Sequence, residues 1–485
     1  MPETAAGRYR IAHLHQPDGW LSPGYLEIDA AGMIASVSAE QPEGWEEREI
    51  QRLDGFVVPG MLNLHSHAHQ RALAGRTEYI GPDPATSADN FWAWRERMYA
   101  LAGVLDPEQF QAIAAQAYLE MLKAGYTTVG EFHYLHHDPA GRPYANLAEM
   151  SERVIAAADA TGIALTLLPS LYTHGGIGKP PTAGQRRFIL DVDDFLRLVA
   201  DLRTRLPSHP LLRLGVAPHS VRAVSEANLR ALLDAMPDLL PNSPIHMHVA
   251  EQQGEMDECL AQLGATPARW LFEQFALDDR WTFIHATHCD AAEIAQIAEH
   301  GVTVGFCPTT EADLGDGIFD LVALHQHGGR FGIGSDGNTV LDPAEELRQM
   351  EFAQRLTRQH RAILVAPDNP ATTHAGRRLY DLVFSGGAHA LAQPAGALLP
   401  GLRADLLELD PDHPALFAHQ PDTALDAWIF TSAPGAVRNV MVGGAWQIRD
   451  HHHASEDAIT DEFRKAMRNV AAAFGGRYES VGGDR

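Results

Sequence analysis

Short apolar runs alternate with longer stretches of helical periodicity between Val57 and about Ala390. The helical patterns include Pro107–Ala124, Leu147–Ala160, Ser225–Ala235 and Ala291–His300. The apolar runs number eight: Met61–Ser66, Thr127–Phe132, Ile163–Leu171, Leu212–His219, Ile245–Glu251, Trp281–His288, Val302–Pro308 and Arg330–Asp336. Strands that alternate with helices form parallel sheets, and eight strand–helix units close a barrel. The pattern therefore predicts an α/β fold with a (β/α)8 TIM-like barrel. A doubly wound sheet is the alternative, but no glycine-rich nucleotide fingerprint follows the first run.

The two ends of the chain carry a different pattern, with short strands and frequent turns. Near the N-terminus Tyr25–Asp29 and Met33–Val37 are hairpin-like, and Gly401–Leu409 and Asn439–Ile448 resemble strands near the C-terminus. A helical pattern follows from about Asp457 to Phe474. We expect residues 1–58 and 395–455 to form one small β-domain from both chain ends. Residues 59–394 would then form the catalytic barrel, and residues 456–485 a C-terminal helix and tail.

Composition narrows the classes of partner. The 485 residues include 37 basic and 63 acidic side chains, a net charge of −26, which disfavours nucleic acid because phosphate binding needs a basic face. No stretch approaches the 18 or so apolar residues of a membrane span, and Met1–His15 lacks the apolar core of a signal peptide. The three cysteines show no C-x-x-C spacing that would indicate a thiolate metal site. A cytoplasmic protein without membrane contact is the expectation.

Histidine is abundant, with 26 in the chain, and several stand where predicted strands end. The first strand ends at His65 and His67, whose side chains share a face because strand residues i and i+2 point the same way. Similar groups close the fifth, sixth and eighth strands: His246, His248 and Glu251, then His285 and His288, then Asp336. Each group alone is more often structural. Their joint position at the carboxyl ends of barrel strands, where such barrels carry their chemistry, predicts a metal-dependent active site.

The segment Val58–His67 is similar to the first-strand motif of the amidohydrolase superfamily, and the order of the later groups resembles its single-metal deaminases. The resemblance implies one Zn²⁺ per chain, bound by His65, His67, His248 and Asp336, with Glu251, His285 and Asp336 as the catalytic residues. Nitrogen and carboxylate ligands suit zinc, although Fe²⁺ or Mn²⁺ would also fit them.

The number of metal ions depends on the lysines, because two-metal members of the superfamily bridge their ions with a modified lysine on an inner strand. Before His248 the chain has only Lys123, in a helical stretch, and Lys179, in a loop rich in proline and glycine. A single ion is therefore the prediction.

A narrower resemblance rests on six further segments: Leu64–Gly75, Asn90–Glu96, Leu171–Gly176, Gly184–Phe188, Ala217–Arg222 and Cys307–Gly317. Together they are similar to the N-formimidoyl-L-glutamate deiminases of histidine degradation, from about residue 10 to residue 475. The resemblance implies a dicarboxylate substrate and a homodimer. It also implies a set of substrate-binding residues: Gln70, Arg95, Tyr134, His219 and Arg222. Two arginines suit this substrate physically, because the guanidinium fork matches a planar carboxylate.

Two positions depart from the family pattern. Gly337-Asn338 follows Asp336 where Ser-His is common, and His69 replaces an aromatic residue. The ligand and proton-carrier sets are intact, so we expect these departures to affect the pocket wall and the substrate specificity, and not the class of reaction.

The mechanism implied by the resemblance is hydrolytic deimination. Zinc would acidify a water, and Asp336 with His285 would accept its proton. Glu251 would protonate the leaving nitrogen, which departs as ammonia and leaves N-formyl-L-glutamate. The alternatives are a related deaminase that acts on another amidine or on a heterocycle such as guanine, and a metal-binding scaffold without catalysis.

Overall fold

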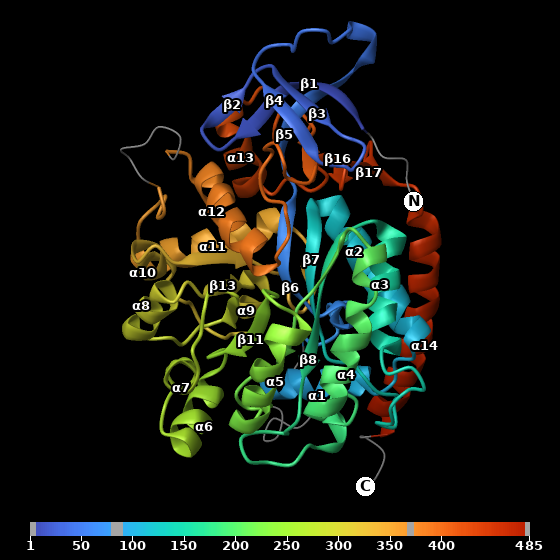
Figure 1. The fold of residues 1–485 in the computed structure, drawn as a ribbon, viewed down its shortest axis with the longest axis vertical. Helices are drawn as coiled ribbons and strands as arrows, with labels where there is room; N and C mark the ends of the chain where they lie inside the picture. Colours follow the sequence, from blue (N-terminus) through green and yellow to red (C-terminus); the bar gives the residue numbers. More distant parts are fainter. Residues whose placement is uncertain (1–5, 79–90, 366–372, 481–485) are drawn as a thin grey trace.

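The computed structural model describes residues 6–78, 91–365 and 373–480. Parallel strands close into a barrel in the order β6 to β14 and back to β6. The barrel strands are β6 (Met61–Ser66), β7 (Tyr126–His133), β8 (Ala164–Leu171), β9 (Leu212–Leu214) with β10 (Ala217–Pro218), β11 (Ile245–Val249), β12 (Trp281–His285), β13 (Thr303–Phe306) and β14 (Arg330–Ile333). The predicted barrel fold is confirmed, and the catalytic ends of its strands lie away from the second sheet (Figure 1).

The fourth predicted strand is interrupted where the barrel closes. Gly215 pairs its N–H with Leu167 O of β8, and the next residue, Val216, pairs instead with Pro244 O just before β11. A Cβ at Gly215 would lie 2.6 Å from Pro244 O, so only glycine allows this close approach. The bend switches hydrogen-bonding partners and so splits the run Leu212–His219 into β9 and β10.

Helices follow the strands with local signals at their ends. Asp106 caps α2, Pro107 fills the first helical position, and Gly125 ends the helix in a left-handed conformation at φ 114°. The larger helices are α1 (Phe91–Ala102), α2 (Pro107–Ala124), α3 (Glu149–Thr161), α4 (Val192–Arg203), α5 (Glu226–Leu239), α6 (Gln253–Leu263), α7 (Pro267–Gln274), α8 (Ala291–Glu299), α11 (Pro343–Arg358), α12 (Ala375–Ala390) and α13 (Pro421–Phe430). Two shorter helices, α9 (Pro308–Leu314) and α10 (Leu321–Gln326), follow β13.

A second, nine-stranded sheet covers the end of the barrel where β6 begins (Figure 1). Its strands come from both ends of the chain: β1 (Gly7–Gln16), β2 (Gly19–Leu21), β3 (Gly24–Ile28), β4 (Ile34–Ser38), β5 (Ile50–Pro59), β15 (Leu406–Leu409), β16 (Val437–Val442), β17 (Ala445–Arg449) and β18 (His452–His453). Strand β5 leads through Gly60 directly into β6, and so joins the two sheets. Its antiparallel pairing with β15 joins the two ends of the chain.

The C-terminal helix α14 (Glu456–Ser480) runs along the side of the barrel beside α2, where Glu456 forms an ion pair with Lys123. Across the described part of the chain, no helix has both the length and the apolar character that a bilayer span requires.

Candidate metal-dependent active site

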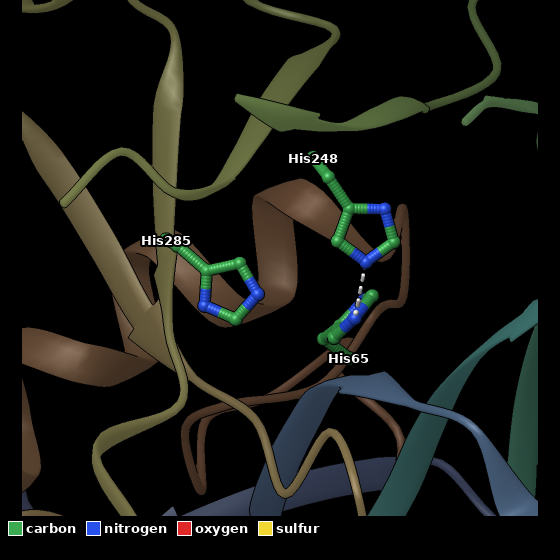
Figure 2. A group of neighbouring side chains, drawn as sticks. All are labelled: His65, His248 and His285. Atoms are coloured by element: carbon green, nitrogen blue, oxygen red, sulfur yellow. Dashed lines mark hydrogen bonds between the residues drawn. The ribbon is translucent and has the colours of Figure 1, made fainter. Parts of the chain in front are cut away.

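Four predicted ligands meet at the carboxyl ends of three barrel strands. His65 Nε2 lies 3.2 Å from His248 Nε2 and 3.4 Å from Asp336 Oδ1, and His67 Nε2 lies 3.4 Å from the same Asp336 oxygen. Figure 2 shows the rings of His65, His248 and His285 turned toward one shared space. All of these side chains are buried. The structure thus brings together groups that the sequence separates by more than 250 residues.

The backbone at the end of β14 brings Asp336 to the histidines of β6. The N–H groups of Ser335 and Asp336 both donate to His65 O, and His67 N donates back to Asp336 O. A Cβ at Gly334 would lie 2.8 Å from His65 Cβ, so glycine permits this contact. Asp336 itself has φ 40°, a left-handed conformation that a non-glycine residue adopts only when its surroundings hold it there. The backbone contacts between the ends of β6 and β14 therefore hold the Asp336 carboxylate beside the histidines.

The ring nitrogens are arranged as metal ligands. His67 Nδ1 donates to Phe132 O at 2.8 Å and His248 Nδ1 donates to His219 O at 3.1 Å, so each Nε2 presents a lone pair. Burial lowers the pKa of both imidazoles and keeps them neutral. Imidazole nitrogens that share a tetrahedral zinc lie about 3.3 Å apart. The separation of 3.2 Å between His65 Nε2 and His248 Nε2 is close to this value. The residues present fit a divalent ion.

Two further groups on the rim of this cluster can carry protons. His285 Nε2 lies 3.6 Å from Asp336 Oδ2 and 4.0 Å from Glu251 Oε1. Burial raises the pKa of Glu251. Burial lowers the pKa of His285, but its hydrogen bond to Glu311 and the nearby carboxylates outweigh this effect and raise the pKa to about 10. His285 has φ 69° and Ala250, just before Glu251, has φ 53°, so strain again collects at the site.

A cavity of about 550 Å³ opens from the ligand cluster, and all five predicted substrate-binding residues line it: Gln70, Arg95, Tyr134, His219 and Arg222. Gln70 Nε2 donates to Tyr134 Oη at 2.8 Å, while Gln70 Oε1 has no hydrogen-bond partner within the described residues. The His219 ring lies 4.8 Å from that of His248. All five residues thus line one cavity, and their roles in substrate binding stay predictions.

Arg222 differs from a simple substrate clamp. Its Nη2 lies 3.5 Å from Glu251 Oε2, and its Nε lies 3.5 Å from Glu255 Oε1. Burial disfavours the charged guanidinium, but the charges of Glu255 and Glu251 outweigh this and raise the pKa of Arg222. The cation thus touches the predicted proton carrier Glu251 as well as the cavity.

Sequence reasoning missed two carboxylates beside the site. Glu255 Oε2 accepts from Glu251 N at 3.0 Å, and Glu311 Oε1 lies 3.2 Å from His285 Nδ1. Both occupy helix turns that follow barrel strands, in α6 and α9, where an acidic residue looks like an ordinary helix-terminus charge. The position of Glu311 was the one signal in the sequence. Among the fifth to eighth predicted strands, only the seventh, which is β13, ends without a predicted functional residue, and Glu311 follows that strand.

The residues of the two departures from the family pattern, His69, Gly337 and Asn338, do not line the cavity. Asn338 Nδ2 donates to Ser66 Oγ at 3.1 Å, and Asn338 Oδ1 accepts from Ser335 Oγ at 2.6 Å. This links the ends of β6 and β14. His69 is buried, with its ring 5.2 Å from Tyr134, and it belongs to no metal-binding group of described side chains.

The chain is similar to proteins of known sequence and structure along nearly all of its length. The model of the amidohydrolase family matches residues 56–446. A formimidoylglutamate deiminase from Pseudomonas aeruginosa is 47% identical over 454 residues, which cover 93% of this chain and 96% of the relative. A solved amidohydrolase from Brucella melitensis has a TM-score of 0.87 and 40% identity, with 96% of this chain and 99% of that chain covered. An adenosine deaminase from Xanthomonas campestris, solved with bound zinc, shares the fold with a TM-score of 0.78, 20% identity and coverage of 97% and 100%.

Proposed function

This chain belongs to the amidohydrolase family, and from that premise we propose that it hydrolyses N-formimidoyl-L-glutamate to N-formyl-L-glutamate and ammonia. It is a hydrolase that acts on a C–N bond. The observation that carries the choice of substrate is the cavity, which holds Arg95 and Arg222 together with the proton carrier Glu251. A dicarboxylate needs cationic partners at a distance from its reacting carbon, and a neutral heterocycle does not.

The metal site belongs to the same proposal. His65, His67, His248 and Asp336 would hold one Zn²⁺. Two groups of close ligand atoms support this site, one with His65, His67 and Asp336 and one with His65, His248 and His285, and they share His65. An ion in that position would supply Lewis acidity, which makes water a usable nucleophile near neutral pH. The donor set does not distinguish zinc from Fe²⁺ or Mn²⁺, so elemental analysis of the purified protein is the direct test.

The side chains of the protein supply the proton transfers. Asp336, with His285 at 3.6 Å, receives the proton that the attacking water loses as its oxygen bonds to the formimidoyl carbon. Glu251, whose pKa is raised by burial, donates a proton to the departing nitrogen. Glu251, now a carboxylate, takes the remaining proton of the hydroxyl group on the tetrahedral carbon and passes it to the same nitrogen. The C–N bond then breaks, ammonia leaves, and the former amidine carbon becomes the formyl group. The proton held by Asp336 replaces the one that Glu251 first gave up.

The other lining residues orient the substrate. Gln70 and Tyr134 line the cavity and are hydrogen-bonded to each other, and His219 stands beside His248. We assign them hydrogen bonds to substrate, with Arg95 and Arg222 assigned to the carboxylates. Holding the amidine carbon close to the nucleophile removes much of the entropic barrier.

An ammonia-release assay tests the proposal. N-formimidoyl-L-glutamate should be deiminated, whereas formamidine, which lacks both carboxylates, should be a far poorer substrate. If guanine is turned over as well as the dicarboxylate, the specificity assignment is wrong although the hydrolase class stands.

Two further expectations accompany the assignment. By resemblance we propose a homodimer in the cytoplasm, and light scattering on the purified protein would measure the assembly.

A further inference from the structure

Helix α9 brings a carboxylate to the far side of His285. The chain leaves β13 at Phe306, passes Cys307 and enters α9 at Pro308, which brings Glu311 into the first turn. Glu311 Oε1 lies 3.2 Å from His285 Nδ1, and its side chain is only 14% exposed. His285 thus has a carboxylate on each side, with Glu311 at Nδ1 and Asp336 and Glu251 at Nε2.

Glu311 is itself held in place. Its Oε1 accepts from Cys307 N at 2.9 Å, and its backbone carbonyl accepts from Asp316 N at 2.9 Å. The carboxylate cannot turn away from His285 without breaking its bond with Cys307 N, and the Asp316 contact holds the backbone of Glu311. The arrangement is typical of a carboxylate that orients a functional histidine.

The hydrogen bond has a consequence for the ring. A carboxylate oxygen can only accept, so His285 Nδ1 must carry the hydrogen in this contact. The other nitrogen, Nε2, is then the one that exchanges a proton with Asp336 or Glu251.

We propose that Glu311 is a positioning residue of the deimination reaction, which keeps a hydrogen on His285 Nδ1 and fixes the orientation of the ring so that Nε2 faces the reacting groups. The expected effect on catalysis rests on the proposed function. The orientation of the His285 ring rests on the hydrogen bond to Glu311 alone. Glu311 does not line the cavity, so it acts through His285 and not on the substrate.

The test uses zinc-loaded full-length protein with the variants Glu311→Ala and Glu311→Gln. We expect Glu311→Ala to lower kcat by about 10–100-fold, the usual cost of removing such a partner, with KM and zinc content unchanged. Formate, which can occupy the vacated carboxylate position, should restore part of the lost kcat in a saturable way. Glu311→Gln keeps the shape and an acceptor oxygen, so it should lose less.

Glu346→Gln is the matched control. Glu346 is also a buried carboxylate that holds the start of α9, because it accepts from Thr309 N at 2.9 Å, but it does not contact His285. Its kcat should stay near that of the wild type and should not respond to formate. A Glu311→Ala kcat within threefold of the wild type, or a loss that formate does not rescue and that Glu346→Gln shares, overturns the proposal.

A second readout is independent of the substrate. In ¹⁵N-histidine-labelled, zinc-loaded protein, the His285 ring, assigned by its loss in His285→Asn, should be protonated at Nδ1. In Glu311→Ala, or in Glu311→Gln if alanine does not fold, the proton distribution should change. An unchanged ring spectrum contradicts the positioning role, even if N-formimidoyl-L-glutamate proves not to be the substrate.

Discussion

Two clusters of buried polar side chains, one at each end of the barrel, are arranged in opposite ways. At the end covered by the second sheet, Arg403 is fully paired: its Nε and Nη2 bind Asp405, its Nη1 donates to Gln393 at 2.6 Å, and Nη2 also donates to Thr128 at 3.0 Å. At the catalytic end, imidazole lone pairs and a carboxylate converge on one another. Buried polar groups are normally satisfied, so the end that leaves acceptors facing each other is the end built for a ligand.

The same contrast between a paired and a ligand-facing polar group occurs within the five residues of β11. His246 and His248 share a face, yet His246 Nε2 donates to Ala390 O at 2.8 Å, whereas His248 Nε2 faces His65. Two residues along a strand span about 6.6 Å, so the same side-chain direction reaches different layers of the barrel. A histidine in this position is structural in one layer and a candidate ligand in the next.

The largest expected effect comes from removing a ligand. Purified protein should carry about one divalent ion per chain, the number that one four-ligand site holds. In His248→Ala the ion content should fall close to zero and turnover should be lost, because one of the three imidazoles is missing. Elemental analysis and the ammonia assay measure both. Two ions in the wild type, or full activity in His248→Ala, would refute the single-site prediction.

Glu251→Gln should have the second-largest effect on turnover. Glutamine has nearly the same shape but cannot transfer a proton, so we expect kcat to fall by about 10²–10⁴-fold while the metal stays bound. Glu293→Gln provides the control, because Glu293 is a buried carboxylate that caps α8 away from the site. A near-normal kcat in Glu251→Gln would assign the proton transfer to another group.

Arg222→Met tests the charge contacts at the cavity. The substitution removes a cation from the substrate side and also leaves Glu251 and Glu255 without their ion pair. We expect a loss in kcat/KM on the order of 2–5 kcal/mol, with KM raised and zinc content unchanged. Arg213→Met, in β9 with backbone carbonyl partners, is the control. If only KM changes in Arg222→Met, the contact with Glu251 is irrelevant to the chemistry.

The barrel could be predicted from the sequence because each strand and each helix has a hydrophobic periodicity that is visible within its own short segment. Helix α2 has the predicted bounds Pro107–Ala124, since its capping signals are local, and β6 has the predicted bounds Met61–Ser66. The break in the fourth strand was not predictable in this way. It depends on the approach of Gly215 to Pro244, a contact between separate strands.

The site shows the same limit. His65, His67 and Asp336 could be predicted because strand ends in a barrel share one face. The roles of Glu255 and Glu311 depend on contacts between loops from different strands, which a charge at a helix start does not reveal. For the same reason strand periodicity alone could not separate His246 from His248, and only the family resemblance singled out His248. The physical difference lies in what each ring meets across the barrel.

The smallest expected effect comes from His246→Leu, the counterpart of the His248 variant. Leucine roughly fills the volume of the ring but donates no hydrogen bond, so Ala390 O is left unpaired inside the barrel. An unsatisfied buried group costs about 1–3 kcal/mol of folding free energy, which should lower the Tm. Below that Tm, the ion content and kcat per folded chain should match the wild type, because the His246 ring bonds to Ala390 O and does not line the cavity. Calorimetry and the ammonia assay measure these quantities together. Loss of the metal in His246→Leu would show that the two layers of β11 are coupled, and that the division between a structural and a catalytic end is wrong.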